Sequence, residues 1–412
     1  MRTARPTATP YSGTKHSTDT DETEKQKLPL LALLALATAV FITSLTETLP
    51  AGLLPAMAGD LRASQSAAGQ TVTIYALGTA LTAMPLTAAT AGWRRKRLLL
   101  TAVACFAVAN SVTAFSSLYV LTMAARFAAG VAAGLAWALL AGYARHMAPI
   151  RLQGKAIAVA MAGIPLALSV GVPAGTFLGQ AVGWRAAFWV MSGLTAVLLA
   201  WISVAVPDYP GTERGARVPM RRTLRIPGVA PVLFVTLIFV LAHTVLYAYI
   251  AAFLDRFGMD GSTDLVLLAF GVASLVSIWI VGAYIHRRLR ALTVASVLLV
   301  GAAAAVLALP TDSAVLVYAA AVAWGLGWGG VPTLLQTAAG AAGGETADDV
   351  QAILVTLWNV AMAGGGFVGG LLLDAFGSAS IPWTVLLLLA PVLAMVLGAR
   401  IHGFPAPGMG MT

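Results

Sequence analysis

Residues 28–57 read LPLLALLALATAVFITSLTETLPAGLLPAM. The run is apolar and long enough to cross the ~30 Å hydrocarbon core of a bilayer, which takes about 20 helical residues. One carboxylate, Glu47, lies inside it. An acidic side chain at the centre of a membrane helix costs roughly 2.5–3.5 kcal/mol on insertion scales. The run therefore predicts a membrane-spanning helix whose acid faces something other than lipid.

The whole chain has the composition of a protein surrounded by lipid. Of its 412 residues, 59% are apolar and 10% are charged, whereas soluble domains carry about 25% charged residues. We find twelve apolar runs, with approximate limits 28–57, 68–91, 98–116, 118–143, 156–182, 186–206, 231–254, 264–285, 291–309, 313–337, 350–373 and 381–399. Each is about long enough to span a bilayer. The sequence therefore predicts an all-α integral membrane protein with twelve transmembrane helices.

Basic residues lie almost entirely in alternate loops. If the N-terminus is cytoplasmic, the inside segments carry 21 Lys and Arg residues and the outside loops carry 3, with Arg126 inside a run. Cytoplasmic loops of membrane proteins have this excess. We therefore predict a multi-pass protein of the cytoplasmic (inner) membrane with both termini in the cytoplasm. The net charge of +9 is attributed to topology and not to nucleic-acid binding, although the acidic loop 338–349 departs from the pattern.

The chain divides into two similar halves. The segment 207–230, rich in proline and arginine, separates six runs from six. GWRRKRLLL at 92–100 and IHRRLRALT at 285–293 follow the second run of each half. Transporters have repeats of this kind, with the substrate site between them. We predict a disordered cytoplasmic tail (1–27), a six-helix bundle (28–206), a cytoplasmic linker (207–230) and a second six-helix bundle with a short tail (231–412).

Four stretches resemble a known family. They are TETLPAGLLPAMAGDL (46–61), RFAAG (126–130), GVPAGTFLGQAVGWRAAFW (171–189) and LYAYIAAFL (246–254). Over about residues 28–400 the chain resembles the major facilitator superfamily, in its twelve-helix drug:proton antiporter type, which includes bacterial efflux proteins for drugs, sugars or nucleosides. The resemblance implies two pseudo-symmetric six-helix bundles around a cavity open to one side at a time. It also implies a monomer that exports a small molecule in exchange for protons, with sugar or nucleoside export and proton symport as alternatives.

The loop after the second run departs from that family. Its usual Asp is Ala91 here, and its leading Gly is Thr87. The basic run of the loop remains, as Arg94, Arg95, Lys96 and Arg97. In the family, the Asp pairs with positive groups and helps to hold one conformation. The basic run therefore has two interpretations: a gating role, or a topology signal whose side chains contact lipid headgroups.

Small residues recur every four positions in the fifth run. They are Gly163, Ala167, Gly171, Gly175 and Gly179. Residues four apart share one face of a helix, and small residues let a neighbouring helix approach closely. Pro165 and Pro173 remove backbone hydrogen bonds and can kink the helix. The resemblance favours a flexible, leak-tight seam between the two halves, with static close packing as the alternative.

Unusual side chains lie at one depth on four runs. With a rise of ~1.5 Å per residue, they lie roughly 12–16 Å from the outer ends of runs one, four, seven and ten. They are Glu47, Arg126, His243, Trp324 and, one turn deeper, Trp328. In the superfamily these four helices line the central cavity. Charged groups inside membrane spans usually face a partner or a cavity.

We hypothesise that Glu47 carries the coupling proton. Burial disfavours its charged form, and Arg126 at similar depth favours it. The alternative is a fixed Glu47–Arg126 ion pair that only joins two helices. Substrate contacts are predicted for Tyr75, His243, Tyr247, Trp324, Trp328 and Asn359. Their structural alternatives are a neutral histidine bonded to a carbonyl, tryptophans that only pack, and an asparagine that bonds between helices.

No enzymatic or cofactor signature stands out. His and Cys residues do not cluster at metal-ligand spacing, and the sequence has no G-x-x-x-x-G-K-[ST] loop for ATP. We expect no cofactor and no metal, and we expect a small-molecule substrate, protons and membrane lipid as partners. A polytopic membrane enzyme or receptor is the alternative class. An enzyme should show paired catalytic groups, and only Glu47 and His243 could serve.

Overall fold

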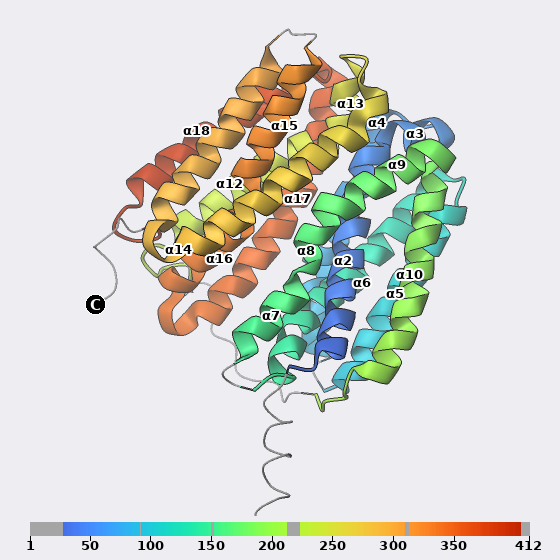
Figure 1. The fold of residues 1–412 in the computed structure, drawn as a ribbon, viewed down its shortest axis with the longest axis vertical. Helices are drawn as coiled ribbons and strands as arrows, with labels where there is room; N and C mark the ends of the chain where they lie inside the picture. The colour runs from blue at the N-terminus through green and yellow to red at the C-terminus, as the bar shows by residue number, and fades with distance from the viewer. Residues whose placement is uncertain (1–27, 91, 150–151, 212–222, 310–312, 405–412) are drawn as a thin grey trace, which may run out of the picture.

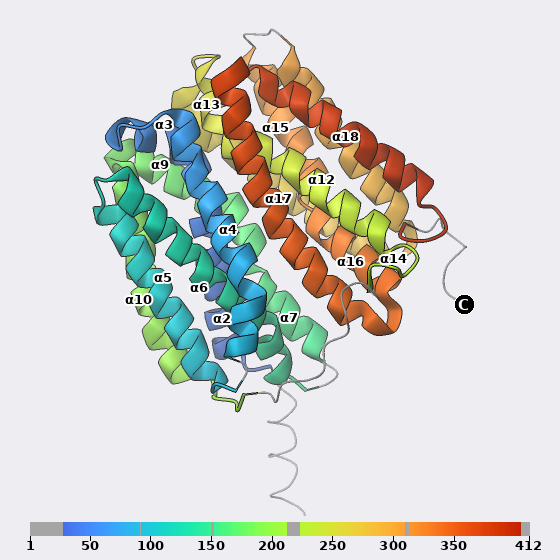
Figure 2. The same ribbon diagram turned by 180° about the vertical axis from the view of Figure 1, so that it is seen from behind.

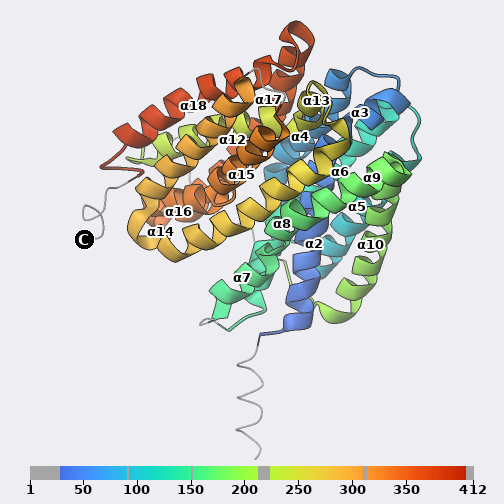
Figure 3. The ribbon, with the colours of Figure 1, turned by 45° about the horizontal axis from the view of Figure 1, so that its top comes forward.

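The computed structural model describes residues 28–90, 92–149, 152–211, 223–309 and 313–404. Helices dominate this part of the chain, and no strand occurs in it. Figure 1 shows two groups of helices side by side, one from each half of the chain. The same division is seen from behind in Figure 2 and with the top turned forward in Figure 3. The expected tail 1–27 and residues 212–222 of the expected linker lie outside the described residues.

The first half contains six spans, of which the first and the fifth are broken. Its elements are α2 (Leu30–Thr48), α3 (Pro50–Asp60), α4 (Gln65–Ala89), α5 (Arg95–Phe115), α6 (Tyr119–His146), α7 (Gln153–Met161), α8 (Gly163–Leu166), the π-helical turn η2 (Ala167–Gly171), α9 (Val172–Val182) and α10 (Trp184–Ala205). Helices α2 and α3 together form span one. Span five runs from α7 through α8 and η2 to α9.

The second half repeats this plan. Its elements are α12 (Val229–Ala248), α13 (Ile250–Asp255), the 3₁₀ turn η3 (Asp260–Ser262), α14 (Thr263–Ala308), α15 (Ala314–Trp328), α16 (Val331–Gly343), the 3₁₀ turn η4 (Gly344–Thr346), α17 (Ala347–Phe376) and α18 (Ser380–Gly398). Non-helical backbone angles at Arg288 divide the 46-residue α14 into two spans. Span seven consists of α12 and α13, and span ten of α15 and α16.

The prediction of an all-α membrane fold is confirmed. Within the described residues, eleven spans are long and apolar enough to cross a membrane. The remaining expected span is α4, which lies against α6 and α17. Its 25 residues reach ~37 Å, enough to cross a hydrocarbon core. Each of the twelve apolar runs thus corresponds to one helix, to one of the two parts of α14, or to a broken series of helices.

Proline lies at a break in three of the four broken spans. Pro50, Pro173 and Pro332 lie in the first turn of α3, α9 and α16, where a missing N–H is tolerated. Span seven breaks without proline at Tyr249, whose φ and ψ are −116° and 18°. Spans one and seven, which occupy equivalent positions in the two halves, therefore both break near the same end of the molecule.

The apolar core joins the two halves near one end. We call the end where α2 begins, at Leu30, the near end, and the end where α3 finishes, at Asp60, the far end. One cluster of buried side chains lies within the first half and includes Leu36 and Phe106. The other runs from Leu49 and Leu53 of the first half into the second half. The halves therefore share a continuous core on the side of the breaks.

Candidate functional site

Glu47 lies in the last turn of α2, two residues before the break at Leu49. The residue is 9% exposed. The residue before it, Thr46, accepts a hydrogen bond on its hydroxyl from Asn110 Nδ2 of α5 at 3.2 Å. The carboxylate is therefore buried inside the protein, at the place where span one changes direction.

Arg126 of α6 is fully buried, with 0% of its surface exposed. Its Nη1 donates to the Thr46 carbonyl at 2.8 Å, and its Nε donates to the Thr71 carbonyl at 3.3 Å. The guanidinium carbon lies 4.7 Å from the centre of the Tyr75 ring, within cation–π range. Nη2 has no hydrogen-bond partner among the described residues. Two carbonyls and a ring therefore hold the charge, and the Nη2 nitrogen with its two N–H groups is unused.

Arg126 lies near Glu47, because the carbonyl that it binds belongs to Thr46, the residue directly before Glu47. No ion pair joins them, however, among the ion pairs of the described residues. The fixed ion pair considered as an alternative is thus not formed in this conformation. Tyr75 donates its hydroxyl to the Thr43 carbonyl at 3.3 Å and is completely buried. In this conformation Tyr75 therefore packs its ring against the Arg126 guanidinium inside the first half.

His243, Trp324 and Trp328 form an aromatic cluster in the second half. The His243 and Trp328 rings are stacked, with centroids 3.5 Å apart and planes 5° apart. Trp324 donates from Nε1 to His243 Nδ1 at 3.1 Å. His243 Nδ1 is therefore an acceptor without a proton, which fixes the tautomer of a neutral ring. This is a neutral histidine, as the structural alternative required, but its partner is an indole and not a backbone carbonyl.

The acidic site and the aromatic cluster meet at Tyr247. Tyr247 lies one turn after His243, and the two ring centroids are 5.3 Å apart. Its buried hydroxyl faces the Thr48 side chain, at a contact outside good hydrogen-bond geometry. Thr48 directly follows Glu47 in the chain. Tyr247 therefore links the predicted coupling acid to the predicted substrate contacts across the two halves.

Asn359 differs from the expectation of an interhelical hydrogen bond. Its Nδ2 donates to the Val355 carbonyl of its own helix, α17, at 2.9 Å. The neighbouring Trp358 lies near Trp328, with ring centroids 5.8 Å apart. Asn359 is 7% exposed. The backbone bond leaves the amide oxygen as the group that could meet a ligand.

The glycine face of span five packs against span one, not against the other half. A Cβ atom added at Gly163 would lie 2.2 Å from the Ala37 carbonyl oxygen, and one at Gly175 would lie 2.7 Å from Leu49 Cδ1. Gly171 and Gly179 likewise meet side chains of span one. The expectation of a seam between the halves along this face is therefore wrong, because α2 and α3 belong to the same half.

A different face of span five meets the second half. A Cβ atom added at Gly271 of α14 would lie 2.4 Å from Ser169 Cα. Ser169 lies in η2, and its hydroxyl bonds to the Pro165 carbonyl at 2.6 Å. A π-helical turn rotates the following residues relative to a regular helix and is frequent at functional sites. The backbones of spans five and eight thus touch at this turn.

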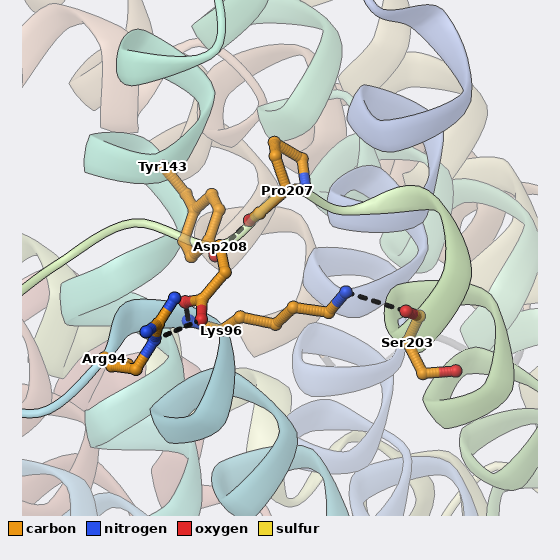
Figure 4. Close-up of polar contacts among 6 residues, drawn as sticks. All are labelled: Arg94, Lys96, Tyr143, Ser203, Pro207 and Asp208. Atoms are coloured by element: carbon orange, nitrogen blue, oxygen red, sulfur yellow. Dashed lines mark hydrogen bonds and ion pairs between the residues drawn. The ribbon is translucent and has the colours of Figure 1, made fainter.

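The basic run finds its carboxylate in Asp208, after span six. Arg94 forms an ion pair with Asp208, and the Lys96 backbone N–H donates to Asp208 Oδ1 at 3.2 Å (Figure 4). Desolvation opposes ionisation of Asp208, but the hydrogen bonds from Arg94 and Lys96 outweigh it, so the pKa of Asp208 lies below its usual value. Ala91, at the usual Asp position, lies outside the described residues.

Further hydrogen bonds join the ends of α5, α6 and α10 near this ion pair. Lys96 Nζ donates to the Ser203 carbonyl at 2.7 Å, and the Tyr143 hydroxyl donates to the Pro207 carbonyl at 2.7 Å (Figure 4). The Arg95 N–H donates to the Tyr209 carbonyl at 2.9 Å. We call this group of contacts the near-end brace. It joins α5, α6, the last turn of α10 and the segment after α10, which all belong to the first half.

Tyr249 fills a notch between the halves at the far end. It is completely buried at the break of span seven. A Cβ atom added at Gly69 of α4 would lie 2.3 Å from its ring, and one at Gly369 of α17 would lie 2.6 Å from the ring. Its hydroxyl donates to the Gly366 carbonyl at 2.8 Å and accepts from Gln70 Nε2 at 3.3 Å. Tyr249 therefore closes the contact between α4 and α17.

Sequence reasoning had no signal for these last partners. Asp208 lies 114 positions from Arg94. Span seven contains several aromatic residues, and the sequence does not tell which of them packs against glycines. The glycines of α17 were visible, but spacing alone does not tell which ring they receive. In the described part, no group of three or more His, Cys, Asp or Glu residues could hold a metal ion.

Comparison with known proteins agrees with this arrangement. The sequence model of the Major Facilitator Superfamily matches residues 36–365. A chloramphenicol efflux pump of Mycobacterium tuberculosis strain H37Rv is 31% identical over 355 residues, covering 84% of this chain and 86% of the pump. The purine ribonucleoside efflux pump NepI of Escherichia coli strain K12 is 27% identical over 352 residues, covering 85% of this chain and 89% of the pump.

A solved structure has the same fold. The crystal structure of a mutant of the nucleoside transporter NupG superposes with a TM-score of 0.69. The match covers 90% of this chain and 99% of NupG, at 12% sequence identity. At that identity the likeness concerns the arrangement of the helices alone.

Proposed function

Because the chain belongs to the major facilitator superfamily, we propose that it is a secondary transporter of the cytoplasmic membrane, which exports a small organic molecule in exchange for protons. The observation that carries this proposal is the arrangement of Glu47, Arg126 and Tyr247. A buried carboxylate lies one residue from the carbonyl that binds a buried cation, without an ion pair between the two charges. Tyr247 of the opposite half faces Thr48, the residue after Glu47, and packs on the aromatic cluster.

The absence of the ion pair supports a role for Glu47 in proton transfer. In a fixed buried pair, losing one partner strands the other charge and costs about 3–5 kcal/mol. Here two backbone carbonyls and the Tyr75 ring hold Arg126. Glu47 can therefore take up a proton without leaving Arg126 unpartnered. The unused Nη2 donor of Arg126 is available to the Glu47 carboxylate, or to a substrate oxygen, in another conformation.

We further propose that the site opens alternately to the two sides of the membrane. Tyr249 joins α4 and α17 at the far end, and the shared core lies on the same side. Opening the far end requires Tyr249 to leave its notch between glycines. The break of span seven at Tyr249 would let α13 move with α14 relative to α12. Protonation of Glu47 and release of substrate would accompany that opening.

The aromatic cluster supports a substrate that carries a planar ring. His243 and Trp328 stack face to face and are 8% and 5% exposed. Opening of the site would expose these faces, and aromatic faces bind rings in offset or edge-to-face contact. Chloramphenicol and purine ribonucleosides, named as the substrates of two relatives, each join an aromatic ring to a hydroxylated part. We therefore propose an aromatic, hydroxylated, neutral molecule as the class to test first.

A proton-release experiment tests the proposal. Candidates from an efflux screen are added to purified protein in weakly buffered detergent with a pH indicator dye. The wild-type protein should release protons when substrate binds, and Glu47→Gln should bind substrate and release none. If Glu47→Gln releases as many protons as the wild type on binding, another group carries the proton.

A further inference from the structure

A pocket of about 480 Å³ opens between α5 and α10 at the near end. Two cationic residues, Lys96 and Arg97, line it together with three apolar residues, Leu100, Ala104 and Leu199. Asp208 and Thr101, whose hydroxyl is bonded to the Arg97 carbonyl, complete the lining. Leu100 and Ala104 follow Lys96 by one and two helical turns. The pocket therefore changes from charged to apolar along the axis of α5, away from the near end.

The charge that the pocket presents is positive. Asp208 is already paired with Arg94 and bonded by the Lys96 N–H. Lys96 Nζ donates to the Ser203 carbonyl, a neutral group that leaves the charge of the ammonium uncompensated. The Arg97 side chain is exposed and belongs to none of the ion pairs of the described residues. An anion in the pocket would therefore meet two uncompensated cations.

The pocket continues the apolar outer surface of the first half. On the outer side of α5 and α10, Val108 is 63% exposed, Val197 65% and Val204 87%. In a membrane protein such a surface faces acyl chains. Trp93, just before the basic run, is 49% exposed, and tryptophan is enriched at the level of the lipid headgroups. The cations of the pocket thus lie at headgroup level, with the acyl-chain region directly beyond.

We propose that this pocket binds the headgroup of an anionic phospholipid. The phosphate would lie against Lys96 and Arg97, and the first methylenes would cover Leu100, Ala104 and Leu199. A lipid bound here contacts both α5 and α10, two of the three helices whose ends the near-end brace joins, and so it stabilises the folded first half. This role is separate from transport of substrate and does not rest on the proposed function.

The test uses the purified full-length protein after delipidation. Thermal unfolding is measured with added phosphatidylglycerol, with phosphatidylcholine of the same acyl chains, and with inorganic phosphate. Phosphatidylglycerol should raise the unfolding temperature most, because it alone combines net charge with acyl chains. Its apparent affinity should fall about fivefold for each charge removed, as expected for a basic side chain near an anionic membrane surface. Arg97→Gln removes one charge from an exposed side chain, and Lys96→Gln/Arg97→Gln removes both.

Arg145→Gln is the matched control, because Arg145 is exposed in the last turn of α6 and is absent from the ion pairs of the described residues. It should keep the wild-type affinity, and Arg97→Lys should restore most of what Arg97→Gln loses. The proposal is overturned if Arg145→Gln weakens phosphatidylglycerol as much as Arg97→Gln does, since the effect is then one of diffuse charge. It is equally overturned if inorganic phosphate stabilises as strongly as the lipid, or if Arg97→Gln changes nothing.

Discussion

Gly69→Ala should weaken closure of the far end. The new Cβ would lie 2.3 Å from the Tyr249 ring, whereas ordinary contact begins at 3.4 Å, so about 1.1 Å must be gained. The ring cannot retreat freely, because Gly369 of α17 packs against its other side and the Gly366 carbonyl accepts a hydrogen bond from its hydroxyl. Helices α4 and α17 must therefore separate.

The size of the effect follows from the cost of overpacking. Inserting a methyl group into a packed core costs about 1–3 kcal/mol. At 1.4 kcal/mol per tenfold change, the ratio of closed to open far ends should fall by roughly 5- to 150-fold. Spin labels at Ser64 and Ser378, one in each half at the far end, would report this change as a longer distance in double electron–electron resonance.

Gly193→Ala is the control for a methyl group added to a helix of the first half. Nothing lies within 4 Å of the new Cβ at that position, so the label distances should remain those of the wild type. The same distance distribution in Gly69→Ala and Gly193→Ala would refute the role of Tyr249 as the contact that closes the far end.

Three further predictions concern packing, the near-end brace and topology. Gly163→Ala should lower the unfolding temperature below that of Gly193→Ala, because its Cβ would lie 2.2 Å from a carbonyl oxygen of α2 and such overpacking costs about 1–3 kcal/mol. Equal unfolding temperatures of the two variants would contradict this prediction. The pKa of Asp208 is lowered on folding, so its contribution to stability is present at neutral pH and is lost as the pH falls through that lowered pKa. Asp208→Asn should remove this part of the pH dependence of the unfolding temperature, and an unchanged pH dependence would contradict the role of Asp208 in the near-end brace. In a Cys105→Ala background, a cysteine that replaces Ser64 should react with an impermeant maleimide in intact cells, and one that replaces Ser12 should not. Labelling of the cysteine at position 12 would show that the topology is opposite to the predicted one.

The sequence predicted the helices better than it predicted their neighbours. Runs of apolar residues indicate membrane spans whatever the tertiary structure, and all twelve correspond to helices or helix series. Glu47, Arg126, His243, Trp324 and Trp328 were selected as unusual side chains inside apolar runs, and the rise of a helix then placed them at a similar depth. Of these, the structure joins Arg126 to the chain beside Glu47, and joins the last three into one cluster.

Partners could not be predicted, because spacing along a helix defines a face and not what that face meets. The glycines of span five were predicted to lie at the seam between the halves, but they pack against span one. The missing Asp at Ala91 suggested a lost contact, whereas Asp208 from a distant segment supplies a carboxylate to Arg94. Spacing likewise does not indicate that Tyr249 lies between glycines of α4 and α17, because these helices are far apart in the chain.

The central claim is that Glu47 couples transport to protons, and one measurement tests it most directly. Wild-type and Glu47→Gln proteins are reconstituted into vesicles, and movement of a substrate from the efflux screen is followed against its gradient under an imposed pH gradient. The account predicts that the wild type concentrates the substrate, whereas Glu47→Gln does not, although it still exchanges substrate down its gradient and is recovered in normal yield. Vesicles with Glu47→Gln that still pump substrate uphill when the pH gradient is imposed would contradict the account.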